Sequence, residues 1–390
     1  MDVRIQPRRL SGAVTPPPSK SMAHRAVLAM ALSDGKGELF NVEDSQDIQA
    51  TKRCVESLKT SRPAGALPLL DCGESGSTLR FLIPIALALA GGGVFTGRGR
   101  LMERPQQPYF DIFEEKGIHY ERKDGALLVR GTLAPGTYRL PGNVSSQFVT
   151  GLLYALPLLP GDSVIQITTP LESSGYVDMT LDMLRKFGVA VEHKSYEAFR
   201  VPGNQAYHAR SITVESDWSQ AGFWYAAKAL DSSVDILGLE PRSTQGDRVV
   251  AEHSARLSRP GDVDIDVSGC PDLLPPLAVM AAVRNGTTRF VNAARLRMKE
   301  SDRLATTAAA LNALGGQAEE GADSLTVHSV PSFSGGTVDG ANDHRIVMAA
   351  AIAATRSTAP VTILGAGAVN KSYPSFWEDY KRLGGNIHVL

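Results

Sequence analysis

Basic side chains recur beside Ser, Thr or Asp in short polar segments of this chain. Seven such segments precede or begin runs with the apolar spacing of a helix: PSKSMAHRA, GESGSTLRF, NVSSQFVTG, SDWSQAGFW, MKESDRLAT, NDHRIVMAA and NKSYPSFWE. Ser, Thr and Asp are favoured at helix N-caps, where free backbone N–H groups and the helix dipole attract anions. The pattern therefore predicts several helix starts that bind a negatively charged ligand.

The cations in these segments are of the kind that bind phosphate and carboxylate groups. Arginine offers a planar fork of donors, and lysine offers a compact charge. Any one of them alone is typical of a solvated surface, but the chain has a formal net charge of −1, so their grouping is local. Together they indicate one site for polyanions. The eight residues are Lys20, Arg25, Arg80, Arg104, Lys299, Arg303, Arg345 and Lys371.

Two carboxylates occur in the same setting and could move protons. Asp272 lies in SGCPDLLPPL, before an apolar run, and Glu300 lies between Lys299 and Arg303. Both are candidates for general acid–base chemistry at a hydroxyl group or at carbon. An N-cap for Asp272 and a helix ion pair for Glu300 are the structural alternatives, and the sequence leaves them open.

Neutral side chains complete the candidate site. Ser145, Ser146 and Gln147 are donors and acceptors suited to a phosphate or a polyol. Tyr176, in LESSGYVDM, could cover a ring or lie exposed at a helix start. His24 and His344 lie beside candidate site residues, and we interpret them as packing or orienting groups.

Other functional classes lack their signatures. Cys54, Cys72 and Cys270 show no CxxC or Cys/His ligand spacing, so neither a zinc site nor a disulfide framework is expected. No GxGxxG or GxSxG motif is present, and GAGAVNKS breaks the P-loop order because Asn370 precedes Lys371. The near-zero charge argues against nucleic acid. The start, MDVRIQPRRL, predicts no signal peptide, and Phe81–Ala90 is too short for a membrane span and predicts a buried helix.

An internal repeat indicates how the site is positioned. Amphipathic runs end in glycine and pass into an alternating, strand-like run at Gly117, Gly188, Gly315 and Gly384. The segment around Gly261 fills the one wide gap, and CVESLKTSRPAG is a degenerate sixth copy. A period of about 65 residues, repeated six times, predicts an α/β chain built from repeated units. At 390 residues the chain fits two domains.

The segments resemble one family closely and occur in its order. PSKSMAHRA, GESGSTLR, MERP, VSSQF, SSGYVD, PDLLPPLAV, MKESDRL, NDHR and NKSYPSF look like 5-enolpyruvylshikimate-3-phosphate (EPSP) synthase. The resemblance implies an α/β (α+β) fold of two similar domains, each of three βαβαββ units in an inside-out α/β barrel, with helix N-termini facing the interdomain cleft. Residues 1–12 and 215–390 would form the phosphoenolpyruvate side, with the catalytic Asp, Glu and Lys. Residues 13–214 would form the shikimate 3-phosphate side.

The resemblance also implies a reaction and the residues that carry it. The enolpyruvyl group of phosphoenolpyruvate would move to the 5-hydroxyl of shikimate 3-phosphate, without metal or cofactor. The implied catalytic residues are Asp272, Glu300, Lys371 and Lys20. Those implied to bind shikimate 3-phosphate are Lys20, Ser21, Arg25, Ser145, Ser146, Gln147, Ser173, Tyr176, Asp272 and Lys299. Those implied to bind phosphoenolpyruvate are Lys20, Gly76, Arg104, Gln147, Glu300, Arg303, Arg345 and Lys371. Arg80 would support the site, and a cytoplasmic monomer without nucleic-acid or membrane partners is expected.

Some positions depart from the commonest family pattern. Glu74 and Ser75 stand where many members have Asn and Ala, Phe81 replaces a frequent Pro, and Arg295 stands where some members have Asn. Two alternative functions are compatible with a related scaffold. A transferase that acts on UDP-N-acetylglucosamine would carry Lys-Asn where this chain has Lys20-Ser21, and a non-catalytic binder would have lost part of the implied catalytic set.

Overall fold

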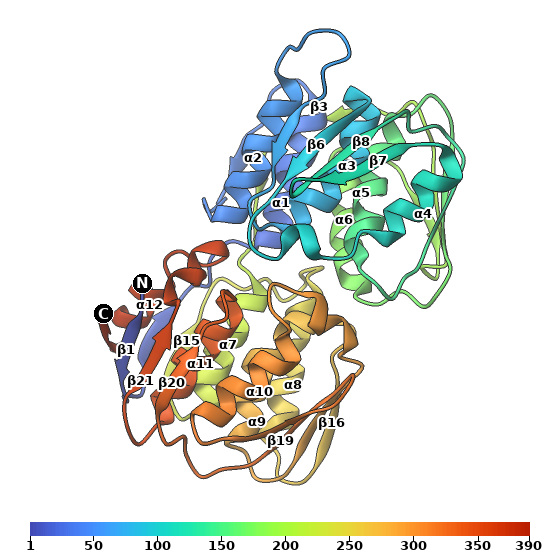
Figure 1. Cartoon of the computed structure of the whole chain (residues 1–390). Coiled ribbons are helices and arrows are strands. Elements are labelled where there is room, and N and C mark those ends of the chain that lie inside the picture. Colours follow the sequence, from blue (N-terminus) through green and yellow to red (C-terminus); the bar gives the residue numbers. More distant parts are fainter. The chain divides into compact units, whose positions relative to one another are not determined.

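A computed structural model describes all 390 residues and divides them into two compact units (Figure 1). The discontinuous unit comprises residues 1–19 and 215–390, and the central unit comprises residues 20–214. The first junction therefore lies at 19/20, not at 12/13 as the sequence predicted. The reason is that β2 (Ser11–Val14) pairs in parallel with β15 (Ser233–Ile236), and the Ser19 N–H donates to the Glu215 carbonyl.

Two complete βαβαββ units lie in the central unit. In both, the first two strands pair in parallel and the last two add as an antiparallel hairpin, giving the orders β5-β6-β8-β7 and β9-β10-β12-β11. The first comprises β5 (Leu69–Asp71), α3 (Gly76–Ala90), β6 (Gly92–Thr96), α4 (Gln107–Lys116), β7 (His119–Lys123) and β8 (Ala126–Arg130). The second comprises β9 (Thr137–Leu140), α5 (Ser146–Ala155), β10 (Ser163–Ile167), α6 (Ser174–Lys186), β11 (Glu192–Lys194) and β12 (Ala198–Val201).

Two more complete copies lie in the discontinuous unit. One comprises β16 (Val263–Asp266), α9 (Leu274–Ala282), β17 (Thr288–Val291), α10 (Arg303–Ala313), β18 (Gln317–Glu320) and β19 (Leu325–His328). The other comprises β20 (Gly336–Asp339), α11 (His344–Ala353), β21 (Val361–Leu364), α12 (Phe376–Arg382) and β22 (Asn386–Val389). Its fourth strand is β1 (Val3–Gln6), which pairs with both β21 and β22, so the two chain ends share one sheet.

The remaining two copies keep their helix pairs but only short strand pairings. In the central unit they are α1 (Lys20–Leu32) and α2 (Gln46–Lys59), with β3 (Ser33–Asp34) and β4 (Leu39–Phe40) pairing to β13 (Tyr207–His208) and β14 (Ile212–Thr213). In the discontinuous unit they are α7 (Trp218–Ala229) and α8 (Val250–Leu257), beside β2 and β15. The six predicted repeats thus correspond to six helix pairs.

The predicted glycines follow the second helix of a pair. Gly117, Gly188, Gly261, Gly315 and Gly384 all have positive φ, between 67° and 101°. Glycine reaches this left-handed region without steric cost, so it ends the helix and turns the chain into the next strand. The degenerate copy after α2 differs, because Thr60 ends that helix in an extended conformation.

The first helix of each pair is buried on nearly every side. In α3, for example, the residues from Thr78 to Leu87 are all buried, which confirms the buried helix predicted at Phe81–Ala90. Figure 1 shows α7, α9, α10 and α11 between the sheet that contains β20 and β21 and the sheet that contains β16 and β19. The core of the unit therefore consists of helices, and its sheets lie outside them. None of the helices combines the length and apolar character that crossing a membrane requires.

Candidate active site

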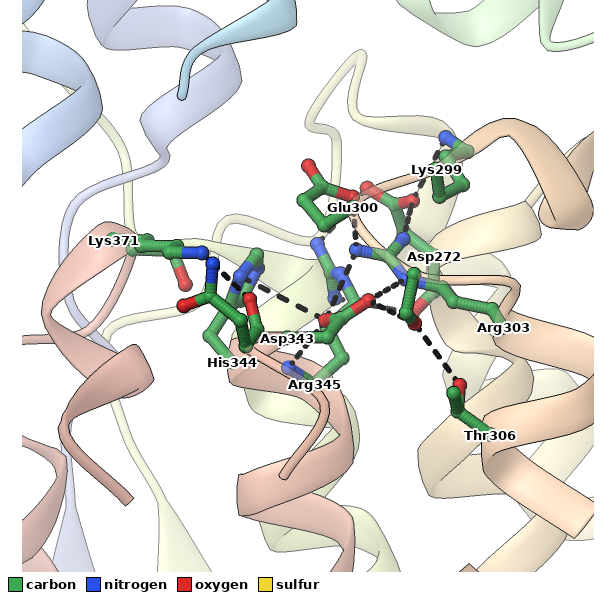
Figure 2. Close-up of polar contacts among 12 residues, drawn as sticks. Asp272, Lys299, Glu300, Arg303, Thr306, Asp343, His344, Arg345 and Lys371 are labelled. Carbon is green, nitrogen blue, oxygen red and sulfur yellow. Dashed lines mark hydrogen bonds and ion pairs between the residues drawn. The ribbon is translucent and has the colours of Figure 1, made fainter. Parts of the chain in front are cut away.

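Three helix starts in the discontinuous unit bring charged side chains together (Figure 2). Asp272 lies in the short 3-10 turn Pro271–Leu273 that leads directly into α9. Asp302 caps α10 by accepting from the Ala305 N–H at 3.2 Å, and Asp343 caps α11 by accepting from the Arg345 N–H at 2.9 Å. These caps fix the first turns of α10 and α11, and so the directions of Arg303 and Arg345.

The Asp272 carboxylate is the meeting point of three cations. Its Oδ1 lies 3.1 Å from Lys299 Nζ and 2.8 Å from Arg303 Nη1, and its Oδ2 lies 2.9 Å from Arg345 Nη2. Burial alone would raise the pKa of this carboxyl, but the charges of Arg345, Lys299 and Arg303 hold it well below its usual range. Asp272 is therefore ionised and is a weak base in this arrangement.

Arg303 connects three carboxylates and is itself only 1% exposed. Its Nη2 lies 2.6 Å from Glu300 Oε2, and its Nε lies 2.8 Å from Asp343 Oδ2. Burial alone would lower the pKa of this guanidinium, but the charges of Asp343, Glu300 and Asp272 raise it above its usual value. Arg303 thus stays charged and sets the positions of the two carboxylates that were predicted to act on protons.

Asp343 is a residue that the sequence analysis did not single out. It is fully buried and accepts hydrogen bonds from Arg303, from the Ser301 hydroxyl at 3.0 Å and from the Arg345 N–H. The sequence does contain a signal for this residue. Asp343 lies in NDHR directly before a helix, at the N-cap position where Asp is favoured. The same segment places His344 Nδ1 3.9 Å from Asp343 Oδ1, in a fully buried position.

Lys371 reaches the start of α11 from another element. It ends the 3-10 segment Ala366–Lys371, is 4% exposed, and donates from Nζ to the Asn342 carbonyl at 2.6 Å. Figure 2 shows its ammonium group directed toward the turn that precedes Asp343 and His344. Five predicted site residues of this unit thus form one contact network and the sixth lies at its edge: Asp272, Lys299, Glu300, Arg303, Arg345 and Lys371.

A second cluster lies in the central unit, at the start of α1. Lys20 is the first residue of this helix, and its Nζ lies 2.7 Å from Asp47 Oδ2. Arg25, one turn later, is buried and donates to the Ser21 carbonyl at 2.6 Å and to the Tyr176 carbonyl at 2.7 Å. Burial is the main reason that the pKa of Arg25 falls to about 10. Arg25 therefore ties α1 to the start of α6.

The α5 start carries the neutral donors that the sequence predicted. The Ser145 hydroxyl accepts from the Gln147 N–H at 3.3 Å and caps the helix, and Ser146 is buried. The Gln147 side chain accepts from Arg80 Nη1 at 2.8 Å and donates to the Ser77 hydroxyl at 2.9 Å. Arg80 thus orients the Gln147 side chain.

Ser173 and Tyr176 lie at the start of α6. Ser173 precedes the helix in a left-handed conformation, with φ 56°, and is buried. Tyr176 is half-buried, and its ring packs against the core of the central unit. The ring is thus partly committed to packing, so Tyr176 is not the fully exposed tyrosine that was one of its two sequence interpretations.

Gly76, the first residue of α3, lies directly against Arg104. A Cβ atom built on Gly76 would lie 2.6 Å from Arg104 Nη1. Any side chain here would displace the guanidinium, so glycine keeps the end of Arg104 in this position. Glu74 contacts the same loop, since a Cβ on Gly99 would lie 2.6 Å from its Oε2. Glu74, which stands where many family members have Asn, therefore contacts the loop that contains Arg104.

Two further residues of interest, His24 and Arg295, make hydrogen bonds within the chain. His24 is fully buried and its Nδ1 lies 2.7 Å from the Thr51 hydroxyl; burial, with Lys20 and Arg25 nearby, lowers its pKa well below the usual value. Arg295 donates to the Ser268 carbonyl at 2.7 Å, within the loop that leads to Asp272. No three His, Cys, Asp or Glu side chains are grouped so as to hold a metal ion.

The chain is similar to known proteins over nearly its whole length. The family model for EPSP synthase (3-phosphoshikimate 1-carboxyvinyltransferase) matches residues 5–380. The chain belongs to the EPSP synthase family. A 3-phosphoshikimate 1-carboxyvinyltransferase from Clostridium kluyveri is 45% identical over 99% of this chain and 98% of that protein, and one from Clostridium acetobutylicum is 44% identical over the same shares.

Solved structures support the fold of this EPSP synthase family member. EPSP synthase from Acinetobacter baumannii matches over 100% of both chains, with a TM-score of 0.79 at 24% identity. The enolpyruvyl transferase NikO from Streptomyces tendae matches over 99% of this chain and 98% of that chain, with a TM-score of 0.76 at 18% identity. The family, the two-unit α/β fold and the enolpyruvyl transferase class predicted from the sequence are thus confirmed.

Proposed function

We propose that this chain transfers the enolpyruvyl group of phosphoenolpyruvate to the 5-hydroxyl of shikimate 3-phosphate and releases inorganic phosphate. The observation that carries the proposal is the Asp272 carboxylate held by three cations, with Glu300 and Lys371 at the adjoining helix starts. The names of the relatives, 3-phosphoshikimate 1-carboxyvinyltransferase, support the same reaction.

Both substrates carry phosphate and carboxylate groups and therefore repel each other. The cations of the candidate site would neutralise these charges and let the two substrates bind together. We assign shikimate 3-phosphate chiefly to the central unit, where helix starts combine cations with neutral donors. The residues assigned to it are Lys20, Ser21, Arg25, Ser145, Ser146, Gln147, Ser173 and Tyr176, with Asp272 and Lys299 from the discontinuous unit. The residues assigned to phosphoenolpyruvate are Lys20, Gly76, Arg104, Gln147, Glu300, Arg303, Arg345 and Lys371.

The bond changes take place in two steps. In the addition, the 5-hydroxyl oxygen bonds to C2 of phosphoenolpyruvate and passes its proton to the phosphate group, which later leaves protonated, while a proton adds to the C3 methylene. In the elimination, C3 loses a proton and the C2–O bond to phosphate breaks, so that phosphate leaves with the bonding electrons. Positioned acids and bases typically contribute about 10² to 10⁴ in rate to such transfers.

Charge decides how we assign the proton transfers. Glu300 is ion-paired with Arg303 at 2.6 Å, so it is a carboxylate, and we assign it to removing the proton from C3. The Lys371 ammonium carries a proton, and we assign it to protonating C3. Because its low pKa makes Asp272 a weak base, we assign it to orienting the 5-hydroxyl by accepting its hydrogen bond.

Phosphate release from purified protein with both substrates and no added metal tests the reaction. We expect turnover in the wild type and its loss in Asp272→Ala and Lys20→Ala, with Lys381→Ala, an exposed lysine of α12, as the matched control. UDP-N-acetylglucosamine offered as the acceptor should release no phosphate. A wild type that binds both substrates without releasing phosphate would identify a binding protein instead.

Deuterium from the solvent separates the proton assignments. In D₂O, reversible addition should place deuterium at C3 of recovered phosphoenolpyruvate in the wild type. Lys371→Ala should abolish this exchange, whereas Glu300→Gln should allow addition and block elimination, so that a covalent adduct accumulates. Exchange that persists in Lys371→Ala would remove the assignment of that residue.

We further infer a cytoplasmic monomer. Cys54, Cys72 and Cys270 are buried free thiols, which suits a reducing compartment. Light scattering behind a sizing column measures the assembly state directly, and a mass of two or more chains would contradict a monomer of 41.6 kDa.

A further inference from the structure

A cavity of about 520 Å³ lies in the discontinuous unit at the end opposite the charged cluster. It is lined where α7, α8 and α9 end, by residues such as Ala229, Leu257 and Met280. Both α7 and α9 begin near the candidate active site, α9 directly after Asp272, so the cavity lies at the far ends of these helices. Its volume is within the range of about 300 to 1,000 Å³ that is typical of small-molecule sites.

The walls of this cavity are held in place by Arg284. Its guanidinium donates to the carbonyls of Arg259 and Gly261, both at 2.6 Å, and its Nε donates to the Leu257 carbonyl at 3.1 Å. A further bond joins the Gly261 N–H to the Asn285 carbonyl at 2.9 Å. The loop after α8 is therefore fastened to the end of α9, and the cavity is formed before any ligand enters.

The charge of the cavity is of one sign. Lys228 and Arg259 line it, no acidic residue does, and neither side chain makes an ion pair or a hydrogen bond in the structure. Both are exposed, so their charges are free to meet an anion at the mouth. The Asn285 amide, also on the lining, adds an uncommitted donor and acceptor.

The floor of the cavity is apolar. Met280 and Leu257 are 1% and 4% exposed, and Val283 lies half-buried beside them. An apolar floor below a cationic rim suits a ligand that has an apolar body and one anionic end. We propose that this cavity is a second binding site, distinct from the candidate active site, for a small carboxylate with an aromatic or aliphatic body.

A purely structural explanation of the two cations competes with this proposal. Cations near helix C-termini interact favourably with the helix dipole, and Lys228 lies in the last turn of α7. That explanation predicts an effect on stability and none on ligands. The two accounts therefore differ in whether a carboxylate binds and in whether these side chains set its affinity.

Calorimetric titration of the full chain with 2-naphthoate tests the proposal, with neutral 2-naphthalenemethanol as the matched probe. We expect the carboxylate to bind at least ten times more tightly than the alcohol, and equally well when phosphoenolpyruvate and shikimate 3-phosphate are present at saturation. The double variant Lys228→Ala/Arg259→Ala should weaken 2-naphthoate binding about tenfold. Arg289→Ala/Lys381→Ala, which removes two exposed cations elsewhere on the unit, should leave it unchanged.

A second variant fills the cavity without removing charge. Ala229→Trp places a large side chain against the apolar floor and should abolish binding of 2-naphthoate while phosphate release stays at the wild-type rate. Equal binding of the two probes, no binding of either, or displacement of 2-naphthoate by phosphoenolpyruvate would each overturn the proposal. None of these outcomes bears on the proposed reaction, which phosphate release tests separately.

Discussion

Arg345 donates twice to Asp272, from Nη2 to the carboxylate oxygen Oδ2 at 2.9 Å and from Nη1 to the backbone oxygen at 3.0 Å. A guanidinium fork that holds both oxygens fixes the position of the aspartate as well as its charge. The two residues are 73 positions apart and belong to the starts of different helices. The first turns of α9 and α11 are thus joined at the point where the proposed chemistry takes place.

This pairing predicts how stability depends on pH. The folded-state pKa of Asp272 is depressed, so the residue contributes stability above its unfolded pKa of about 3.9, and that contribution is lost as pH falls below it. Asp272→Asn should therefore have a lower free energy of unfolding than the wild type at pH 7, and the difference should shrink below about pH 4. Urea unfolding at pH 7, 5, 4 and 3 measures it. A difference that is constant over this range would contradict the depressed pKa.

Asp343→Ala should be far more damaging than a neighbouring cap substitution. It removes one of the three carboxylates that pair with the buried Arg303, and removing one partner of a buried pair typically costs about 3 to 5 kcal/mol. Asp302→Ala, which removes the cap of α10 at a more exposed position, should cost about 1 kcal/mol. Urea unfolding of both variants compares them directly. Equal losses would mean that Asp343 acts only as a helix cap.

Gly76→Ala should weaken phosphoenolpyruvate binding and leave the fold intact. The new methyl group would lie 2.6 Å from Arg104 Nη1, and the end of this side chain can move aside at little cost. We expect KM for phosphoenolpyruvate to rise about tenfold or more, with a smaller change in kcat, since the loss of one charge-assisted contact corresponds to roughly 1.5 to 3 kcal/mol. Gly269→Ala, at a position with open space for a Cβ atom, is the control. Unchanged steady-state constants would show that Arg104 does not bind this substrate.

Thr307→Val should stabilise the chain. The Thr307 hydroxyl is buried in α10 without a hydrogen-bond partner, and such a group typically costs about 1 kcal/mol or more. Valine has the same shape without the polar atom. The adjacent Thr306→Val should have the opposite effect, because the Thr306 hydroxyl donates to the Asp302 carbonyl at 2.8 Å. The melting temperatures of the two variants test this prediction. A lower melting temperature for Thr307→Val than for the wild type would show that the Thr307 hydroxyl is hydrogen-bonded in solution.

The positions of the helix starts could be predicted from the sequence, because caps and glycine stops are local signals. SDRL, NDHR and VSSQF each begin a helix where the capping argument placed one. The turns after α4, α6, α10 and α12 were predictable for the same reason, since each depends on one glycine with positive φ.

Partners within the cluster could not be predicted, because they depend on contacts between distant segments. The sequence suggested a local ion pair for Glu300, which Arg303 does make, but Arg303 also pairs with Asp343, 40 residues away. The predicted boundary of the discontinuous unit differs from the observed one for a similar reason. β2 belongs to this unit only because it pairs with β15, more than 200 residues later. Patterns within one window of sequence contain no information about such pairings.

The place of β1 in a sheet with β21 and β22 has a consequence for the order in which the chain folds. On the ribosome the first strand emerges long before its two neighbours, which lie in the last 30 residues. The central unit can complete all its pairings once residue 214 has emerged, whereas β1 cannot complete its pairings until β22 has emerged. Because Val3 faces Val389, a short linker could join the two ends, and a new start at residue 20 would let each half fold as it is made.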